Sequence, residues 1–246
     1  MANSPSGDSV LSRAVRLLEG FRDHAAFSPS ELADRAGLPR TTGYRLIAEM
    51  TEQGLLTRTE TGLIEPGRLM WEIAQRSRLS RTLRQAALPF MQDVNAVVRH
   101  TTQLAVLDGS GVLIVERLSQ QGAAVNPAEV AGTMPAHRTS MGHALLAFSA
   151  PERREEWLAA HRDLIRAERP RLAEELDEVR ARGFARLSGE IDAPTAGLSV
   201  PVLDRSGCAE AALTVVVPRD SPEIPQFLMA LQTAGHGIAR AVRANG

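Results

Sequence analysis

The stretch "SPSELADRAGLPRTTGYRLIAEMTEQG", residues 28–54, has the pattern of two short helices joined by a tight turn. Ser28 and Glu31 predict the start of the first helix, because each side chain can accept a hydrogen bond from the other's backbone amide. Gly37 predicts the end of that helix, since glycine adopts the left-handed backbone of a tight turn at low cost. Pro39 begins the second helix. Two short helices joined by a glycine-containing turn predict a helix-turn-helix.

The second helix of this motif divides into a buried face and an exposed face. Gly43, Leu46, Ile47 and Met50 recur at helical spacing and predict the buried stripe. A glycine inside a helix costs about 0.5–1 kcal/mol relative to alanine, so we expect another helix to cross Gly43 too closely for a side chain. A helix that enters the major groove by its N-terminal half would present the polar face to bases and phosphates. The residues expected to contact DNA from this helix are Arg40, Thr41, Thr42, Tyr44 and Arg45. The alternative is an exposed amphipathic helix with no nucleic-acid partner.

The next segment, "LLTRTETGLIEP" (residues 55–66), alternates apolar and polar residues on either side of a turn and predicts a β-hairpin. Apolar residues at helical spacing between Val10 and Phe21 predict a further helix before the motif. Helix, helix, turn, helix and hairpin make a winged helix. Arg58, near the hairpin tip, is a candidate phosphate contact.

The composition is that of an ordinary globular protein: 246 residues, 43% hydrophobic and 23% charged, enough for two compact domains or one large one. The net charge of −1 does not by itself indicate a nucleic-acid partner. The sequence contains no lysine, however, and all its basic side chains other than histidine are arginines, which suit bidentate contacts to phosphate and guanine. No apolar run reaches the roughly 18 residues of a membrane span, and the polar start lacks the features of a signal peptide. The single cysteine, Cys208, cannot form an intrachain disulfide. We therefore expect a cytoplasmic protein with no membrane partner.

The C-terminal part combines hairpins with helices. Residues 101–119 and residues 199–217 each contain two apolar strands around a turn, and so predict an antiparallel sheet. Helices are expected between the hairpins: one over "SMGHALLAF" (residues 140–148), one opened by a capping box from Ser149 to Glu152, and one ended by Gly183. The fold class is α+β, with helices flanking an antiparallel sheet that leaves a concave face for a ligand.

Five segments in this order resemble the IclR family of bacterial transcriptional regulators over essentially the whole chain. They are "SVLSRAVRLLEGF" (9–21), "SELADRAGLPRTTGYRLIAEMTEQGLL" (30–56), "MPAHRTSMGHALLAF" (134–148), "DEVRARGFA" (177–185) and "GLSVPVLDRSGCAEAALTVVVP" (197–218). The resemblance implies a winged helix-turn-helix DNA-binding domain over residues 8–67, a linker helix over 68–83 and a GAF-like effector-binding domain over 84–246. It also implies a dimer or a dimer of dimers.

The resemblance places an effector pocket between the loop "MPAHRTSMG" and the last strands. The first amides of the helix after this loop have no acceptor within the helix and suit a carboxylate. Family members that bind short carboxylates tend to have an acid before the GLSVPV segment, a cysteine near Gly197 and two serines on the last strand. This chain keeps only one hydroxyl, Thr214, which favours a more apolar ligand such as an aromatic acid over a glyoxylate-like one. The implied effector-binding residues are Ser140, Met141, Gly142, Leu187, Gly197, Leu198, Thr214 and Val216.

Catalytic and metal-binding motifs are missing from the sequence. The six histidines are never three or four residues apart, and no CxxC, HExxH, GxSxG, GxGxxG or P-loop pattern occurs. We expect no enzyme activity and no cofactor. The predicted function is a ligand-responsive repressor of a catabolic or transport operon, which binds a near-palindromic operator and releases or rearranges when a small organic acid or aromatic metabolite binds. Its expected partners are operator DNA, that effector and a second copy of the chain. The alternatives are a constitutive DNA-binding protein whose C-terminal domain only oligomerises, and a small-molecule enzyme with an accessory DNA domain.

Overall fold

The computed structural model describes residues 8–22, 24–77, 79–109, 111–120 and 130–245. The chain forms two compact units, residues 1–77 and residues 78–246. The division falls within residues 68–83, which the sequence predicts as a linker. Among the described residues, no helix has the length and apolar character needed to cross a membrane.

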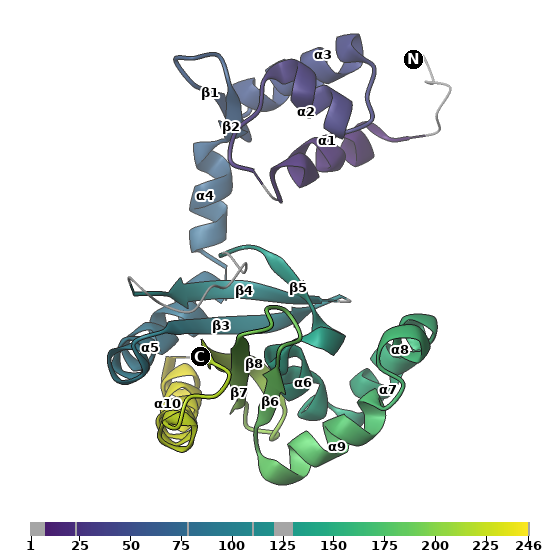
Figure 1. The fold of residues 1–246 in the computed structure, drawn as a ribbon. Coiled ribbons are helices and arrows are strands. Elements are labelled where there is room, and N and C mark those ends of the chain that lie inside the picture. The colour runs from purple at the N-terminus through teal and green to yellow at the C-terminus, as the bar shows by residue number, and fades with distance from the viewer. Residues whose placement is uncertain (1–7, 23, 78, 110, 121–129, 246) are drawn as a thin grey trace. The chain divides into compact units, whose positions relative to one another are not determined.

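The N-terminal unit is a winged helix-turn-helix (Figure 1). The predicted capping box is confirmed: the Glu31 amide donates to Ser28 Oγ (3.3 Å) and the Ser28 amide donates to the Glu31 carboxylate (2.9 Å). Gly37 adopts φ +62° in the turn, as predicted. The elements are α1 (Val10–Glu19), α2 (Pro29–Arg35), α3 (Arg40–Glu52), β1 (Leu56–Arg58) and β2 (Ile64–Pro66).

The crossing of α2 and α3 depends on Gly43. A Cβ atom at this position would lie 2.5 Å from the Cβ of Ala33, so the two backbones approach more closely than any side chain allows. The predicted stripe Leu46, Ile47 and Met50 is buried beside it. The glycine that weakens α3 as an isolated helix therefore fixes how α3 sits on α2.

The wing pairs β1 with β2 in antiparallel register, with Arg58 opposite Ile64 and the turn residue Gly62 at φ +85°. Helix α4 (Arg68–Gln75) follows and has no buried residue. The predicted linker helix over 68–83 is thus interrupted: Arg78 lies outside the described residues, and Leu79–Arg84 forms a π-helical turn that runs into α5 (Gln85–Val98).

The C-terminal unit contains an antiparallel six-stranded sheet in the order β5-β4-β3-β8-β7-β6 (Figure 1). Both predicted hairpins are present as β3–β4 and β7–β8, although Ser110 in the first turn lies outside the described residues. The strands are β3 (Thr101–Asp108), β4 (Gly111–Leu118), β5 (Thr133–Pro135), β6 (Ala185–Ser188), β7 (Thr195–Leu203) and β8 (Ala209–Pro218).

Helices cover both faces of this sheet. Helix α5 and the long α10 (Ile224–Asn245) pack on one face against a core that includes Leu213, Val215 and Val217 of β8. Helix α6 (Ser140–Ala147) packs on the other face, against Ala212 of the same strand. Because side chains alternate along a strand, Thr214 and Val216 face the α6 side. The remaining helices are α7 (Pro151–Ala160), α8 (Arg162–Glu168) and α9 (Leu172–Arg182), which ends at Gly183 as predicted.

The capping box predicted at the start of α7 is wrong. Ser149 turns back to α6, where its hydroxyl donates to the carbonyl of Leu145 (2.8 Å). Ala150 occupies the N-cap of α7, and no side chain caps it. The hydroxyl of a serine between two helices can hydrogen-bond to the backbone of either helix, and here it bonds to the preceding one.

Replacing Gly43 with alanine should loosen the N-terminal unit although alanine favours helices. The new methyl group would meet Ala33, and overpacking of this kind costs about 1–3 kcal/mol. We expect faster amide hydrogen exchange in α2 and α3 of the full chain. Adding Ala33→Gly should restore most of the protection, because it removes the opposing methyl. Unchanged exchange in Gly43→Ala, or no rescue by Ala33→Gly, would contradict the close crossing.

Candidate functional site

Helix α3 presents its predicted DNA-contacting residues to solvent. Arg40, Thr41, Tyr44 and Arg45 are exposed on one face, and Tyr44 is 45% exposed although it is the only tyrosine of the chain. Thr42 is half-buried. An aromatic side chain left this open in a polar surface is typical of a contact residue rather than a core residue.

Two arginines of this surface form weak ion pairs. Arg40 lies 3.4 Å from Asp34 and Arg45 lies 3.3 Å from Glu49, with all four side chains more than half exposed. Exposed pairs of this kind contribute little to stability, so a phosphate or base can replace the carboxylate. Arg58 is exposed at the end of β1 in the wing.

A cavity of about 50 Å³ lies between the start of α6 and the sheet. Its walls come from the α6 start, β3, β5 to β8 and the loop between β6 and β7. Six residues predicted from the sequence line it: Ser140, Met141, Leu187, Gly197, Thr214 and Val216.

Two residues predicted for this pocket do not line the cavity. Leu198 is fully buried in the core on the opposite face of the sheet, because adjacent strand residues point to opposite sides. The Gly142 amide is already satisfied by the Thr139 hydroxyl, which caps α6 (3.2 Å). A Cβ at Gly142 would lie 2.1 Å from the Ala136 carbonyl, so this glycine lets the preceding loop pack on the helix.

A chain of buried hydroxyls joins α6 to the sheet. The Ser199 hydroxyl donates to Ser140 Oγ (2.8 Å) and lies 2.7 Å from Thr214 Oγ1. Ser199 has one proton, so Thr214 must donate to Ser199, and the Ser140 proton remains for a further acceptor. The sequence analysis missed Ser199. The register shift between Val202 and Leu203 places it opposite Thr214, which counting back from the β7–β8 turn would not have shown.

Gln103 on β3 is the second residue that the sequence analysis missed. It is fully buried, lines the cavity and stands in register with Thr214. Neither its Oε1 nor its Nε2 has a hydrogen-bond partner in the part of the chain that the structure describes. A carboxamide within the apolar strand "TTQLAVLD" was the signal in the sequence.

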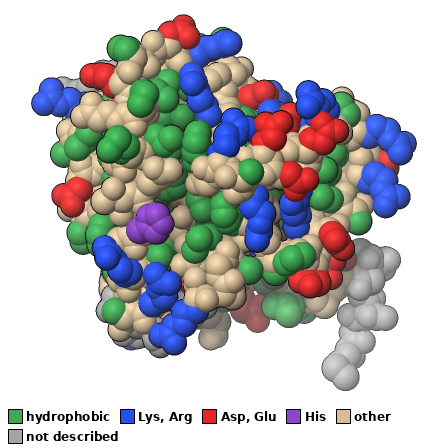
Figure 2. Space-filling view, turned by 90° about the horizontal axis from the view of Figure 1, so that it is seen from below, with side chains coloured by type: hydrophobic (Ala, Val, Ile, Leu, Met, Phe, Trp, Pro, Cys, Tyr) green, Lys and Arg blue, Asp and Glu red, His purple; other side chains and the backbone are tan. Residues whose placement is uncertain are grey.

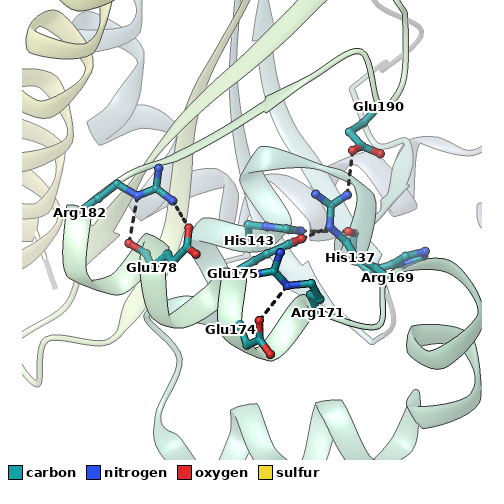
Figure 3. Close-up of polar contacts among 9 residues, drawn as sticks. All are labelled: His137, His143, Arg169, Arg171, Glu174, Glu175, Glu178, Arg182 and Glu190. Atoms are coloured by element: carbon teal, nitrogen blue, oxygen red, sulfur yellow. Dashed lines mark hydrogen bonds and ion pairs between the residues drawn. The ribbon is translucent and has the colours of Figure 1, made fainter.

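Ionic contacts hold the β6–β7 loop over the cavity (Figure 3). The Arg169 guanidinium contacts Glu175 (2.6 Å) and Glu190 (3.0 Å), and Glu190 belongs to that loop and lines the cavity. The Glu190 carbonyl also accepts a hydrogen bond from Arg138 (3.0 Å). The loop is therefore tied both to the segment before α9 and to the segment before α6.

Two buried histidines stiffen the loop before α6. His137 Nε2 lies 2.9 Å from the Glu168 carboxylate, and this hydrogen bond lowers the pKa of Glu168. His143 Nε2 lies 3.0 Å from the His137 carbonyl, and burial lowers the pKa of His143. A neutral His143 that donates to this carbonyl is a structural group. Within the described ranges, no group of three or more His, Cys, Asp or Glu residues could hold a metal ion.

A larger hollow of about 410 Å³ lies between α10 and the β7–β8 turn, with Phe148, Val200 and Leu203 in its walls. Figure 2 shows how apolar side chains gather on the face seen from below, with charged side chains around them. None of the unpartnered buried polar atoms found among the described residues belongs to this hollow, whereas Gln103 belongs to the smaller cavity. Buried polar groups are normally hydrogen-bonded, so the unpaired carboxamide distinguishes the smaller cavity from this hollow.

Comparisons with known proteins identify the family. Residues 10–60 match the IclR helix-turn-helix domain, and residues 75–240 match the bacterial transcriptional regulator IclR C-terminal domain. The chain belongs to the IclR family of bacterial transcriptional regulators. It is accordingly a DNA-binding regulator with a C-terminal effector domain.

Solved and curated relatives cover three quarters or more of the chain. An IclR homologue from Microbacterium hydrocarbonoxydans, solved in complex with 4-hydroxybenzoate, is 37% identical, with 96% of this chain and 100% of that chain covered and a TM-score of 0.85. The regulator XynR of Escherichia coli is 24% identical over 94% of this chain and 96% of its own length. The transcriptional repressor IclR of the same species is 26% identical over 75% of this chain and 72% of its own length.

Proposed function

We propose that this regulator changes its affinity for operator DNA when a small aromatic acid enters the cavity beside α6. One observation carries the proposal: a buried cavity with an unpaired carboxamide, a hydroxyl chain and apolar walls, in a chain 37% identical to a homologue complexed with 4-hydroxybenzoate. The regulated genes would form a catabolic or transport operon. The regulator itself would act in the cytoplasm of a bacterium. Two of the relatives are named as repressors, which supports repression as the direction of regulation.

The carboxylate of such an acid would bind at the start of α6. The amides of Ser140 and Met141 occupy the first two positions of the helix, where no intrahelical acceptor exists. The free Ser140 proton adds a third donor. Met134, Leu187 and Val216 provide apolar walls for a ring.

The small cavity must widen to take a ring. Ligand pockets usually measure about 300–1,000 Å³, well above the 50 Å³ found here. A shift of the β6–β7 loop would provide the space and would lengthen the contacts of Glu190 to Arg169 and Arg138. A ligand that binds only one arrangement of this loop shifts the population of the whole unit toward that arrangement.

A second copy of the chain is the proposed partner for operator binding. One winged helix reads only a few base pairs, so specific binding requires two on a near-palindrome. Apolar side chains are left exposed on α1, where Leu11 is 74% exposed, and on α4, where Trp71 is 64% and Ile73 is 58% exposed. These surfaces could pair two chains. Light scattering at micromolar concentration should give at least twice 26.6 kDa, and a single-chain mass with and without DNA would contradict the proposal.

Removing one arginine from α3 should weaken operator binding. A bidentate contact to guanine contributes about 1–3 kcal/mol, so Arg45→Ala or Arg40→Ala should reduce affinity about 5- to 150-fold for a duplex selected from a random pool by the wild-type chain. Arg240→Ala is the matched control, because it removes an equal charge from the exposed surface of α10. Gel-shift titration measures the affinities. Full affinity in Arg40→Ala, Arg45→Ala and their double mutant would rule out this docking surface.

Filling the cavity should abolish effector binding. Ser140→Phe would place a ring where the carboxylate is expected, and calorimetry with 4-hydroxybenzoate should show at least a tenfold loss of affinity, about 1.4 kcal/mol. Ser149→Ala, a serine replacement at the other end of α6, should bind like the wild type, since Ser149 contacts only Leu145 among the hydrogen bonds described for its side chain. Wild-type affinity in Ser140→Phe would show that the ligand binds elsewhere.

A further inference from the structure

Gln103 is an unusual residue for the middle of a sheet. Its side chain is fully buried, yet the structure supplies no partner for Oε1 or Nε2 among the described residues. Its two polar neighbours in register, Thr214 on β8 and Arg117 on β4, make no hydrogen bond to it. A buried polar group left unpaired costs about 1–3 kcal/mol, so a glutamine at this position is explained most directly by a partner outside the chain.

The carboxamide defines the chemistry of that partner. Oε1 needs a donor and Nε2 needs an acceptor. A hydroxyl group can serve both, whereas a carboxylate only accepts and would leave Oε1 unpaired. The start of α6, with the Ser140 and Met141 amides, offers donors only and suits the carboxylate. The Gln103 end of the cavity therefore suits a hydroxyl group, and the α6 end suits a carboxylate of the same ligand.

The strands beneath the two ends of the cavity are two strand spacings apart, which leaves room for one aromatic ring. Ser199, which holds Ser140, lies on β7, and Gln103 lies on β3, with β8 between these strands. Two strand spacings are roughly 10 Å. A benzene ring with substituents at opposite positions, together with a hydrogen bond at each end, bridges a gap of this size. Arg117 on β4 is paired in register with Gln103, and its buried Nε has no partner in the described part of the chain. The sheet face is therefore polar at this end of the cavity.

We propose that Gln103 is the specificity-determining residue of the effector site, and that it pairs with a hydroxyl group opposite the carboxylate of an aromatic acid. The inference rests on the proposed function, in which the cavity takes such an acid. It adds that the regulator distinguishes para-hydroxylated aromatic acids from those without the hydroxyl. An acid lacking it would leave the carboxamide buried and unpaired.

Calorimetry on the full chain with 4-hydroxybenzoate and benzoate tests this pairing. The wild type should bind 4-hydroxybenzoate at least tenfold more tightly than benzoate. Gln103→Leu should weaken 4-hydroxybenzoate about 10- to 100-fold and should change benzoate far less, so that the preference disappears. Gln232→Leu, a half-buried glutamine on α10 outside the cavity, is the matched control and should keep the wild-type preference.

Thermal melting without ligand separates a binding role from a structural one. Gln103→Leu removes an unpaired buried amide, so its melting temperature should equal or exceed that of the wild type. A lower melting temperature, with equal loss of affinity for both acids, would make Gln103 a structural residue and overturn the inference. Equal wild-type affinity for the two acids would overturn the inference alone. Failure of both acids to bind the wild type would overturn the aromatic-acid function, and the inference with it.

Discussion

The close approach of α6 to the sheet is the constraint on which the effector unit depends. A Cβ at Gly197 would lie 2.5 Å from Ser140 Oγ, so the helix start rests directly on the backbone of β7. This contact allows Ser140, Ser199 and Thr214 to form a buried chain of hydrogen bonds, and the cavity extends from there to Gln103 on β3. A larger residue at position 197 would lift α6, break the chain and remove the cavity walls together.

The loop over the cavity is tied to other segments of the C-terminal unit. Glu190 is held by Arg169, whose other partner is Glu175 at the start of α9, and by Arg138 before α6. Packed interfaces of this kind tend to have discrete arrangements rather than to deform continuously, so a ligand that displaces Glu190 would favour a second arrangement of these segments. In the proposed mechanism, the loop and its ionic contacts are the element that responds to the ligand.

The sequence predicted the features that depend on neighbouring residues. The Ser28 capping box, the Gly37 turn and the buried stripe of α3 follow local rules, and the hairpins follow from alternation and turn residues. Errors arose where two elements compete or where alternation was ignored. Ser149 donates to a carbonyl in the last turn of α6 instead of capping the start of α7, and Leu198 cannot share a face with its neighbour Gly197.

The contacts that shape the cavity required the structure. Strand pairing brings Ser199 and Gln103 to the cavity, and a tertiary contact joins Arg169 to Glu190. Local periodicity specifies neither of these. Thr139, the actual cap of α6, stood next to the predicted residues but was not recognised as a cap.

The proposed mechanism requires that ligand binding in the cavity changes the affinity for DNA. The direct measurement is operator affinity of the full chain with and without saturating 4-hydroxybenzoate, on a duplex selected from a random pool. Coupling of about 1–3 kcal/mol is usual for allosteric proteins, so we predict a 5- to 150-fold change in affinity that Ser140→Phe abolishes. If the acid binds with unchanged operator affinity, the C-terminal unit does not control DNA binding through this cavity, and the ligand-responsive mechanism is contradicted.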